Sequence, residues 1–76
     1  MVIKILGKGC KKCDLLEKNA RLAAQELDLD VTIEKVEDIN AIAEHGVFQT
    51  PALVIDGQVK LAGKVASAKK IKTFLA

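Results

Sequence analysis

Aromatic residues are nearly absent from this 76-residue sequence, which has no Trp, no Tyr and only two Phe. Half of the residues are nonetheless hydrophobic, so the core must be built mainly from Ile, Leu, Val and Ala, and we expect Phe48 and Phe74 to lie in it. With so few aromatic platforms and no arginine cluster, the chain is not expected to bind nucleic acid. The length suffices for a single domain, residues 1–76.

Long apolar runs are also lacking. No run approaches the length of a membrane span, and residues 1–6 are too short for a secretory signal and are interrupted by Lys4. We therefore expect a cytoplasmic chain without membrane contact. In that compartment a Cys-x-x-Cys pair is more often catalytic or metal-binding than structural. Because no long exposed apolar stripe indicates a dimer interface, we expect a monomer.

The sequence contains only two cysteines, Cys10 and Cys13, and they are two residues apart. A disulfide that closes so short a loop would add only about 2 kcal/mol, so a purely structural bridge is an inefficient explanation. If Cys10 begins a helix, the helix dipole and unpaired backbone N–H groups favour its thiolate. The cations of Lys8, Lys11 and Lys12 act in the same direction and are predicted to lower its pKa. This arrangement suits an attacking thiol followed by a resolving thiol.

Apolar periodicity predicts the element order β-α-β-α-β-β-α. The expected strands cover 2–6, 31–36, 52–55 and 59–62, and the expected helices cover 11–27, a short segment capped by Asp38 and ending at His45, and a last segment capped by Ser67. A helix between the first two strands implies a parallel crossover, and Asp56-Gly57 implies a hairpin. We therefore predict an α/β fold with a four-stranded mixed sheet and three helices.

Helical spacing also predicts which side chains face inward. The first helix has one apolar stripe, formed by Cys13, Leu16, Ala20, Ala23 and Leu27. This places Cys13 inside and leaves Cys10, which precedes the stripe, exposed. In the short second helix the expected stripe is Ile39, Ile42 and Ala43.

The Cys-x-x-Cys at a helix start, Thr50-Pro51 before the third strand and the element order together resemble the thioredoxin/glutaredoxin superfamily. More closely, residues 7–13, 17–21 and 65–67 resemble small archaeal and bacterial thioredoxin-like proteins described as redox-active disulfide proteins. The resemblance implies a thioredoxin-like fold, with Cys10 as nucleophile and Cys13 as resolving thiol. It also implies a cis bond before Pro51 and backbone contacts from Thr50 to a bound partner.

The sequence departs from larger members of the superfamily at several positions. Gly9 stands where they carry a Trp, and Lys4 stands where they carry a buried acid. The glutaredoxin-like Cys-Pro-Tyr-Cys is absent, and the Gly-Gly that helps to hold glutathione there is represented only by Ala62-Gly63. These differences argue against glutathione and favour protein disulfides as substrates.

We therefore predict thiol–disulfide exchange with partner proteins, with the Cys10–Cys13 disulfide as the redox group and no further cofactor. A separate reductase, which the sequence does not identify, would return the electrons. The alternative is a soft-metal carrier that binds Cu(I) through the same two thiolates. Copper-carrier domains of this size have a Met where this chain has Lys8, and they end on a strand rather than a helix. A structural zinc site needs four ligands, and this chain offers two Cys and one His, so the predicted oxidoreductase has no metal site.

Overall fold

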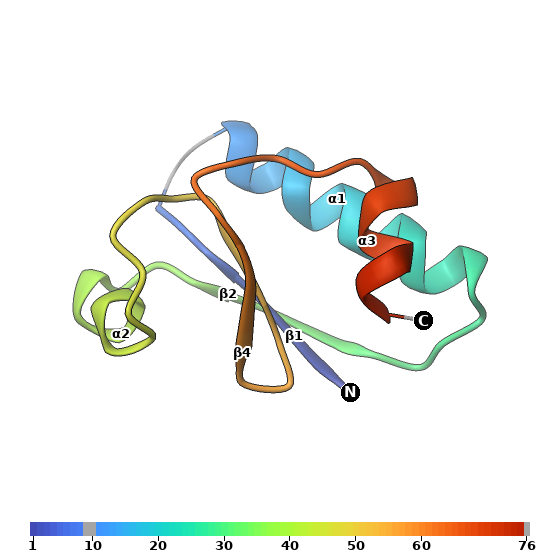
Figure 1. The fold of residues 1–76 in the computed structure, drawn as a ribbon, viewed down its shortest axis with the longest axis horizontal. Coiled ribbons are helices and arrows are strands. Elements are labelled where there is room, and N and C mark those ends of the chain that lie inside the picture. Colours follow the sequence, from blue (N-terminus) through green and yellow to red (C-terminus); the bar gives the residue numbers. More distant parts are fainter. Residues whose placement is uncertain (9–10, 76) are drawn as a thin grey trace.

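The computed structural model describes residues 1–8 and 11–75. Within these residues the elements follow the predicted order β-α-β-α-β-β-α (Figure 1). The strands are β1 (Val2–Leu6), β2 (Thr32–Val36), β3 (Ala52–Ile55) and β4 (Gln58–Ala62). The helices are α1 (Lys11–Glu26), α2 (Ile39–Glu44) and α3 (Ala68–Leu75). The predicted α/β class is confirmed, and the observed ranges differ from the predicted ones only at element ends.

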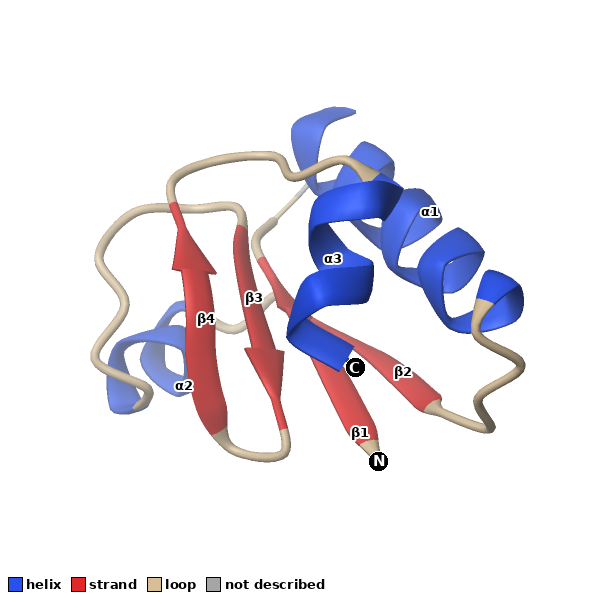
Figure 2. Ribbon diagram, turned by 45° about the vertical axis from the view of Figure 1, so that its right-hand side comes forward, coloured by secondary structure: helices blue, strands red, loops and turns tan. Residues whose placement is uncertain are grey.

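The described strands form one mixed sheet in the order β2-β1-β3-β4 (Figure 2). β1 runs parallel to β2 and antiparallel to β3, and β3 runs antiparallel to β4. A parallel pair needs a long connection, which α1 supplies between β1 and β2. Asp56 and Gly57 join β3 to β4 with φ values of 49° and 83°. Two consecutive positive φ values are what a two-residue hairpin turn requires, so the predicted hairpin is confirmed.

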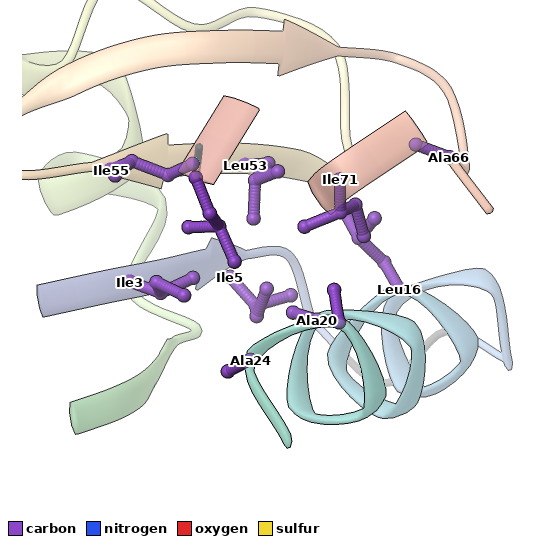
Figure 3. Close-up of a cluster of buried hydrophobic side chains, with 11 residues drawn as sticks. Ile3, Ile5, Leu16, Ala20, Ala24, Leu53, Ile55, Ala66 and Ile71 are labelled. Atoms are coloured by element: carbon purple, nitrogen blue, oxygen red, sulfur yellow. The ribbon is translucent and has the colours of Figure 1, made fainter. Parts of the chain in front are cut away.

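Successive side chains of β1 point to opposite faces of the sheet, and each face carries its own hydrophobic cluster. Ile3 and Ile5 belong to the larger cluster, which α1 and α3 cover, whereas Leu6 belongs to a smaller cluster beneath α2. In Figure 3, side chains of the sheet approach Leu16 and Ala20 from α1 and Ile71 from α3. The two longer helices lie side by side on one face of the sheet, and α2 lies apart from them (Figures 1 and 2).

Two predictions about the core were wrong, and both concern the region around α2. Phe48 is 89% exposed and Ile39 is 71% exposed, although both were expected to face inward. The short helix α2 buries only Ile42, and Ala43 is exposed as well. Val47 is buried in the smaller cluster and takes the core position that Phe48 was expected to fill. The chain turns at Gly46, where φ is 75°, directly before these two neighbouring apolar residues.

The predicted helix caps are present. The Asp38 side chain accepts a hydrogen bond from the Asn40 N–H at 2.9 Å, and the Ser67 hydroxyl accepts one from the Lys70 N–H at 3.2 Å. Phe74, on α3, is half-buried and packs against the larger cluster, so its predicted core position is correct in part.

Candidate active site

Cys13 lies within the described residues, and Cys10, the predicted nucleophile, lies outside them. Cys13 is the third residue of α1, and its side chain is only 1% exposed. It shares the inner stripe of the helix with Leu16 and Ala20, so its burial follows from helical spacing. The predicted burial of Cys13 is confirmed. A shielded thiol suits an intramolecular step better than attack on a bulky partner.

Gly7 brings the end of β1 against Cys13. A Cβ atom at Gly7 would collide with the Cys13 Sγ and would lie 3.5 Å from the Cβ atoms of Cys13 and Thr50. The Gly7 N–H donates a hydrogen bond to the Val36 carbonyl oxygen at 2.9 Å. The missing side chain therefore allows three segments to meet: the end of β1, the first turn of α1 and the loop before β3. In the sequence, the only indication of this contact is a glycine directly after an apolar strand. Sequence analysis did not identify Gly7 as part of the site.

The Thr50–Pro51 peptide bond is cis. Pro51 is buried and Thr50 is exposed. The Pro51 carbonyl oxygen accepts a hydrogen bond from the Gly63 N–H at 2.9 Å, which ties the start of β3 to the segment after β4. Thr50 lies beside Gly7 and Cys13, because a Cβ atom at Gly7 would be close to the side chains of both. Its role in binding a partner remains a prediction.

The three lysines expected to influence the thiols, Lys8, Lys11 and Lys12, are all exposed. Lys11 and Lys12 are the first two residues of α1. None of the three forms an ion pair with another described residue. Positive side chains at a helix N-terminus oppose the helix dipole. Helix stability therefore does not explain their position, and their effect on the thiols remains a prediction.

A fourth lysine near the site was not predicted. The Lys35 Nζ on β2 lies 2.6 Å from the Asp14 Oδ1 and 3.7 Å from a Glu17 carboxylate oxygen, both on α1. The hydrogen bond to Asp14 raises the pKa of Lys35, and the nearby charges of Asp14, Glu17 and Glu37 add to the rise, while burial opposes it. Asp14 follows Cys13 directly in the chain. Sequence analysis missed this contact because β2 and α1 meet only in the folded protein.

An apolar hollow adjoins Thr50. It measures about 260 Å³, and its lining is Ile39, Ile42, Ala43, Val47, Phe48 and Thr50. A second hollow, of about 380 Å³, lies between the loop that follows α2 and β4, and Phe48 lines this one too. The exposed Phe48 ring therefore stands between two depressions, one of which reaches Thr50.

Lys4 occupies the position where larger relatives were expected to carry a buried acid. It is half-buried in the middle of the sheet, in register with Glu34 and Val54. No charged side chain is fully buried in residues 1–8 and 11–75. Across the same ranges, no group of three or more His, Cys, Asp or Glu side chains is placed to hold a metal ion. The two-cysteine copper site would include Cys10 and therefore remains a hypothesis.

The family follows from comparison with known proteins. A family model described as a thioredoxin domain matches residues 1–76. The chain belongs to the thioredoxin family. It is 45% identical to the thioredoxin of Methanothermobacter thermautotrophicus over 75 residues, which cover 99% of this chain and 97% of that protein. It is 43% identical to the thioredoxin of Methanocaldococcus jannaschii over 75 residues, which cover 99% of this chain and 86% of that protein.

Membership in the thioredoxin family confirms the predicted resemblance. At the level of the family, it assigns the chain to the thiol–disulfide oxidoreductases. No helix in the described part of the chain is both long enough and apolar enough to span a membrane.

Proposed function

We propose that this chain exchanges disulfides with partner proteins through Cys10 and Cys13. The observation that carries the proposal is the burial of Cys13 against Gly7, with Thr50 alongside. A thiol in this position is shielded from large partners, which would leave it to react with a sulfur already bound within the site. That is the property required of a resolving cysteine.

In the proposed reaction, the Cys10 thiolate attacks one sulfur of the partner disulfide. The partner S–S bond breaks, a mixed disulfide forms at Cys10, and the first partner thiolate leaves and takes up a proton. Cys13 then loses its proton and attacks the Cys10 sulfur. The second partner thiolate leaves and is protonated. The partner gains two electrons and two protons, and Cys10 and Cys13 end as a disulfide that a separate reductase must reduce.

We favour a protein substrate over glutathione because of the surface beside Thr50. Ile39 and Phe48 are large apolar side chains left exposed there. Exposed apolar surface next to a reactive site fits the apolar side chains of a protein partner better than a small charged tripeptide. The departures from the glutaredoxin pattern support the same choice.

The proposal is tested by the Cys10–Cys13 redox equilibrium, measured by mass spectrometry of alkylated protein across a series of dithiothreitol ratios in metal-free buffer. We expect a reversible two-electron transition between about −270 and −200 mV. Failure to form an internal disulfide, together with stoichiometric retention of Cu(I) against a chelator, would support the metal-carrier alternative instead.

The roles of the two cysteines are tested separately by single substitutions. Cys13→Ser should accumulate a mixed disulfide between Cys10 and a model disulfide protein, because the resolving step is lost. Cys10→Ser should form no such adduct, since Cys13 is buried. Equal adduct formation by both variants would contradict the assignment of nucleophile and resolving thiol.

A further inference from the structure

Thr50 lies between two surfaces of different character. On one side it approaches Gly7 and Cys13, since a Cβ atom at Gly7 would lie 3.5 Å from the Cβ atoms of both Cys13 and Thr50. On the other side it lines the apolar hollow that also contains Ile39 and Phe48. The helices that border these surfaces, α1 and α2, pack on opposite faces of the sheet (Figure 2). A protein segment that lies across Cys13 and Thr50 therefore reaches both surfaces.

The surface on the Cys13 side is cationic. Lys11 and Lys12 precede Cys13 in the first turn of α1, and Lys8 precedes that helix, directly after Gly7. All three lysines are exposed, and within residues 1–8 and 11–75 none of them forms an ion pair. Their ammonium groups are therefore available to carboxylates of a bound protein, which are the partners that an ammonium group prefers.

The first carboxylates of α1 are already neutralised by other residues. The Asp14 Oδ1 lies 2.6 Å from the Lys35 Nζ. The two Glu17 oxygens lie 3.7 Å from the same Lys35 atom and 2.9 Å from the Arg21 guanidinium. Because these acids have their own counter-ions, they do not cancel the positive charge of the lysines that precede Cys13. The charge presented to a partner on this side is positive.

The surface on the hollow side has the opposite character. The residues that line the hollow are uncharged, and Ile39 and Phe48 leave large apolar side chains exposed there. The charged residues directly before Ile39 are two exposed acids, Glu37 and Asp38. An acidic side chain of a partner is therefore attracted on the Cys13 side and repelled on the hollow side, whereas an apolar side chain gains most from the hollow.

We propose that the site selects protein disulfides by the residues on either side of the attacked cysteine. Acidic side chains on one side of that cysteine contact Lys8, Lys11 and Lys12, and an apolar side chain on the other side enters the hollow beside Thr50. This inference rests on the proposed function, because it names the class of protein disulfide on which the same cysteines act. It also implies that the partner segment binds in a single direction.

The test uses synthetic peptides of equal length, each joined as a homodimer by a disulfide at a central cysteine. One peptide has Asp residues before the cysteine and Leu residues after it, and a second has the reverse order. Two further peptides, made in the order that reacts faster, replace Asp by Lys or Leu by Ser. The rate with the reduced wild-type chain is divided by the rate with dithiothreitol, which corrects for the intrinsic reactivity of each disulfide.

We expect one order to react about five- to tenfold faster than the other, and the peptide with Lys in place of Asp to lose this advantage. The variant K11Q/K12Q should reduce the preference for Asp over Lys about three- to fivefold, and F48S should reduce the preference for Leu over Ser. Each preference is a ratio of two peptides with one chain, so a changed thiol pKa cancels from it. Salt at about 0.5 M should weaken the preference for Asp and leave that for Leu.

The double variant K69Q/K70Q is the matched control, because it removes the same charge from the start of α3. The Ala66 carbonyl oxygen, just before α3, accepts a hydrogen bond from the Asn19 side chain at 2.8 Å. Asn19 lies about 10 Å along α1 from Lys12. This control should therefore keep the wild-type preferences.

Equal rates for the two orders would overturn the inference, and so would a preference for Asp that K11Q/K12Q and K69Q/K70Q change alike. If the chain reduces none of the peptides while dithiothreitol reduces them all, the proposed function fails on its own. The inference is then decided by binding alone, with single-chain peptides that carry Ser in place of the cysteine, titrated into the isotope-labelled chain and followed by NMR. Tighter binding of one order would support it, and equal binding of both orders would overturn it.

Discussion

Gly7 and Cys13 are in close contact, with the backbone of the glycine directly beside the side chain of the cysteine. A Cβ atom at residue 7 would collide with the Cys13 Sγ, and the φ of Gly7 is 155°. The residue after β1 therefore has to be small for Cys13 to occupy its buried position. Gly7 also stays paired with Val36, which limits how far the backbone can move to relieve a collision.

Gly7→Ala is expected to lower the unfolding free energy by about 1–3 kcal/mol, because the added methyl group must displace Cys13 or Thr50. It should also slow the release of partner from a mixed disulfide, since Cys13 would be moved. Urea unfolding and single-turnover disulfide exchange measure the two effects.

Gly46→Ala is the matched control for Gly7→Ala. Gly46 also has a positive φ, 75°, but a Cβ there meets no atom within 4 Å. This variant should lose only about 1 kcal/mol from backbone strain and leave disulfide exchange unchanged. If the two glycine variants had the same exchange rate, close packing of Gly7 on Cys13 would not matter for the chemistry.

Replacing Lys11 and Lys12 with Gln should raise the pKa of the Cys10 thiol and make the cysteine pair more reducing. The reason is that two cations near the thiolate are lost, and we expect alkylation at pH 7 to slow about two- to threefold. Helix α1 should not lose stability, because positive charges at its N-terminus are unfavourable for the helix. The double variant K69Q/K70Q serves as control, because it also removes two positive charges, in this case from the start of α3. Unchanged thiol pKa and potential in the first variant would contradict the predicted role of these lysines.

Phe48→Ser should change the unfolding free energy by less than about 0.5 kcal/mol, because the ring is already exposed. It should nevertheless weaken reduction of a protein disulfide about three- to tenfold while leaving reduction of a small aliphatic disulfide unchanged. Steady-state kinetics with both substrates separate these effects.

Leu22→Ser provides the comparison for Phe48→Ser, since Leu22 is an exposed apolar residue on the outer face of α1. It should affect neither substrate. An equal loss with both substrates in Phe48→Ser would indicate a disturbed site rather than a lost contact with the protein partner.

The stability contributed by Lys35 should depend on pH at the alkaline end. Its pKa is raised from 10.5 in the folded chain, chiefly by the hydrogen bond to Asp14. A group with a raised pKa stabilises the fold fully below its unfolded pKa and loses that contribution as pH rises through the folded value. The difference in unfolding free energy between wild type and K35M should therefore be constant at pH values well below 10.5 and should fall as the pH rises past 10.5 through the folded pKa.

Chemical denaturation of both chains across this pH range provides the measurement, and K72M serves as control for general loss of a lysine. A wild-type advantage over K35M that stayed undiminished as the pH rose past 10.5 to the alkaline limit of the fold would show that packing of the Lys35 hydrocarbon chain, and not its charge, is responsible.

Most of the fold could be predicted because its signals are local. The inner stripe of α1, the caps at Asp38 and Ser67 and the Asp56-Gly57 turn each depend on residues within a few positions of one another. The error at Phe48 arose where two neighbouring apolar residues compete for one core position, and the error at Ile39 arose at the first residue of a short helix that buries only Ile42. Local pattern does not show that Val47 would be the buried one.

The sequence by itself determined the element order, the burial of Cys13 and the pairing of a Cys-x-x-Cys with Thr50-Pro51, because period, capping and motif spacing are properties of consecutive residues. Only the tertiary structure decided that Gly7 meets both Cys13 and Thr50, that Lys35 binds the first turns of α1, and that Phe48 faces solvent. Each of these relationships joins segments that are distant in the chain, or depends on which side chain fills a shared space. Packing of the whole chain fixes them, and no local pattern encodes them.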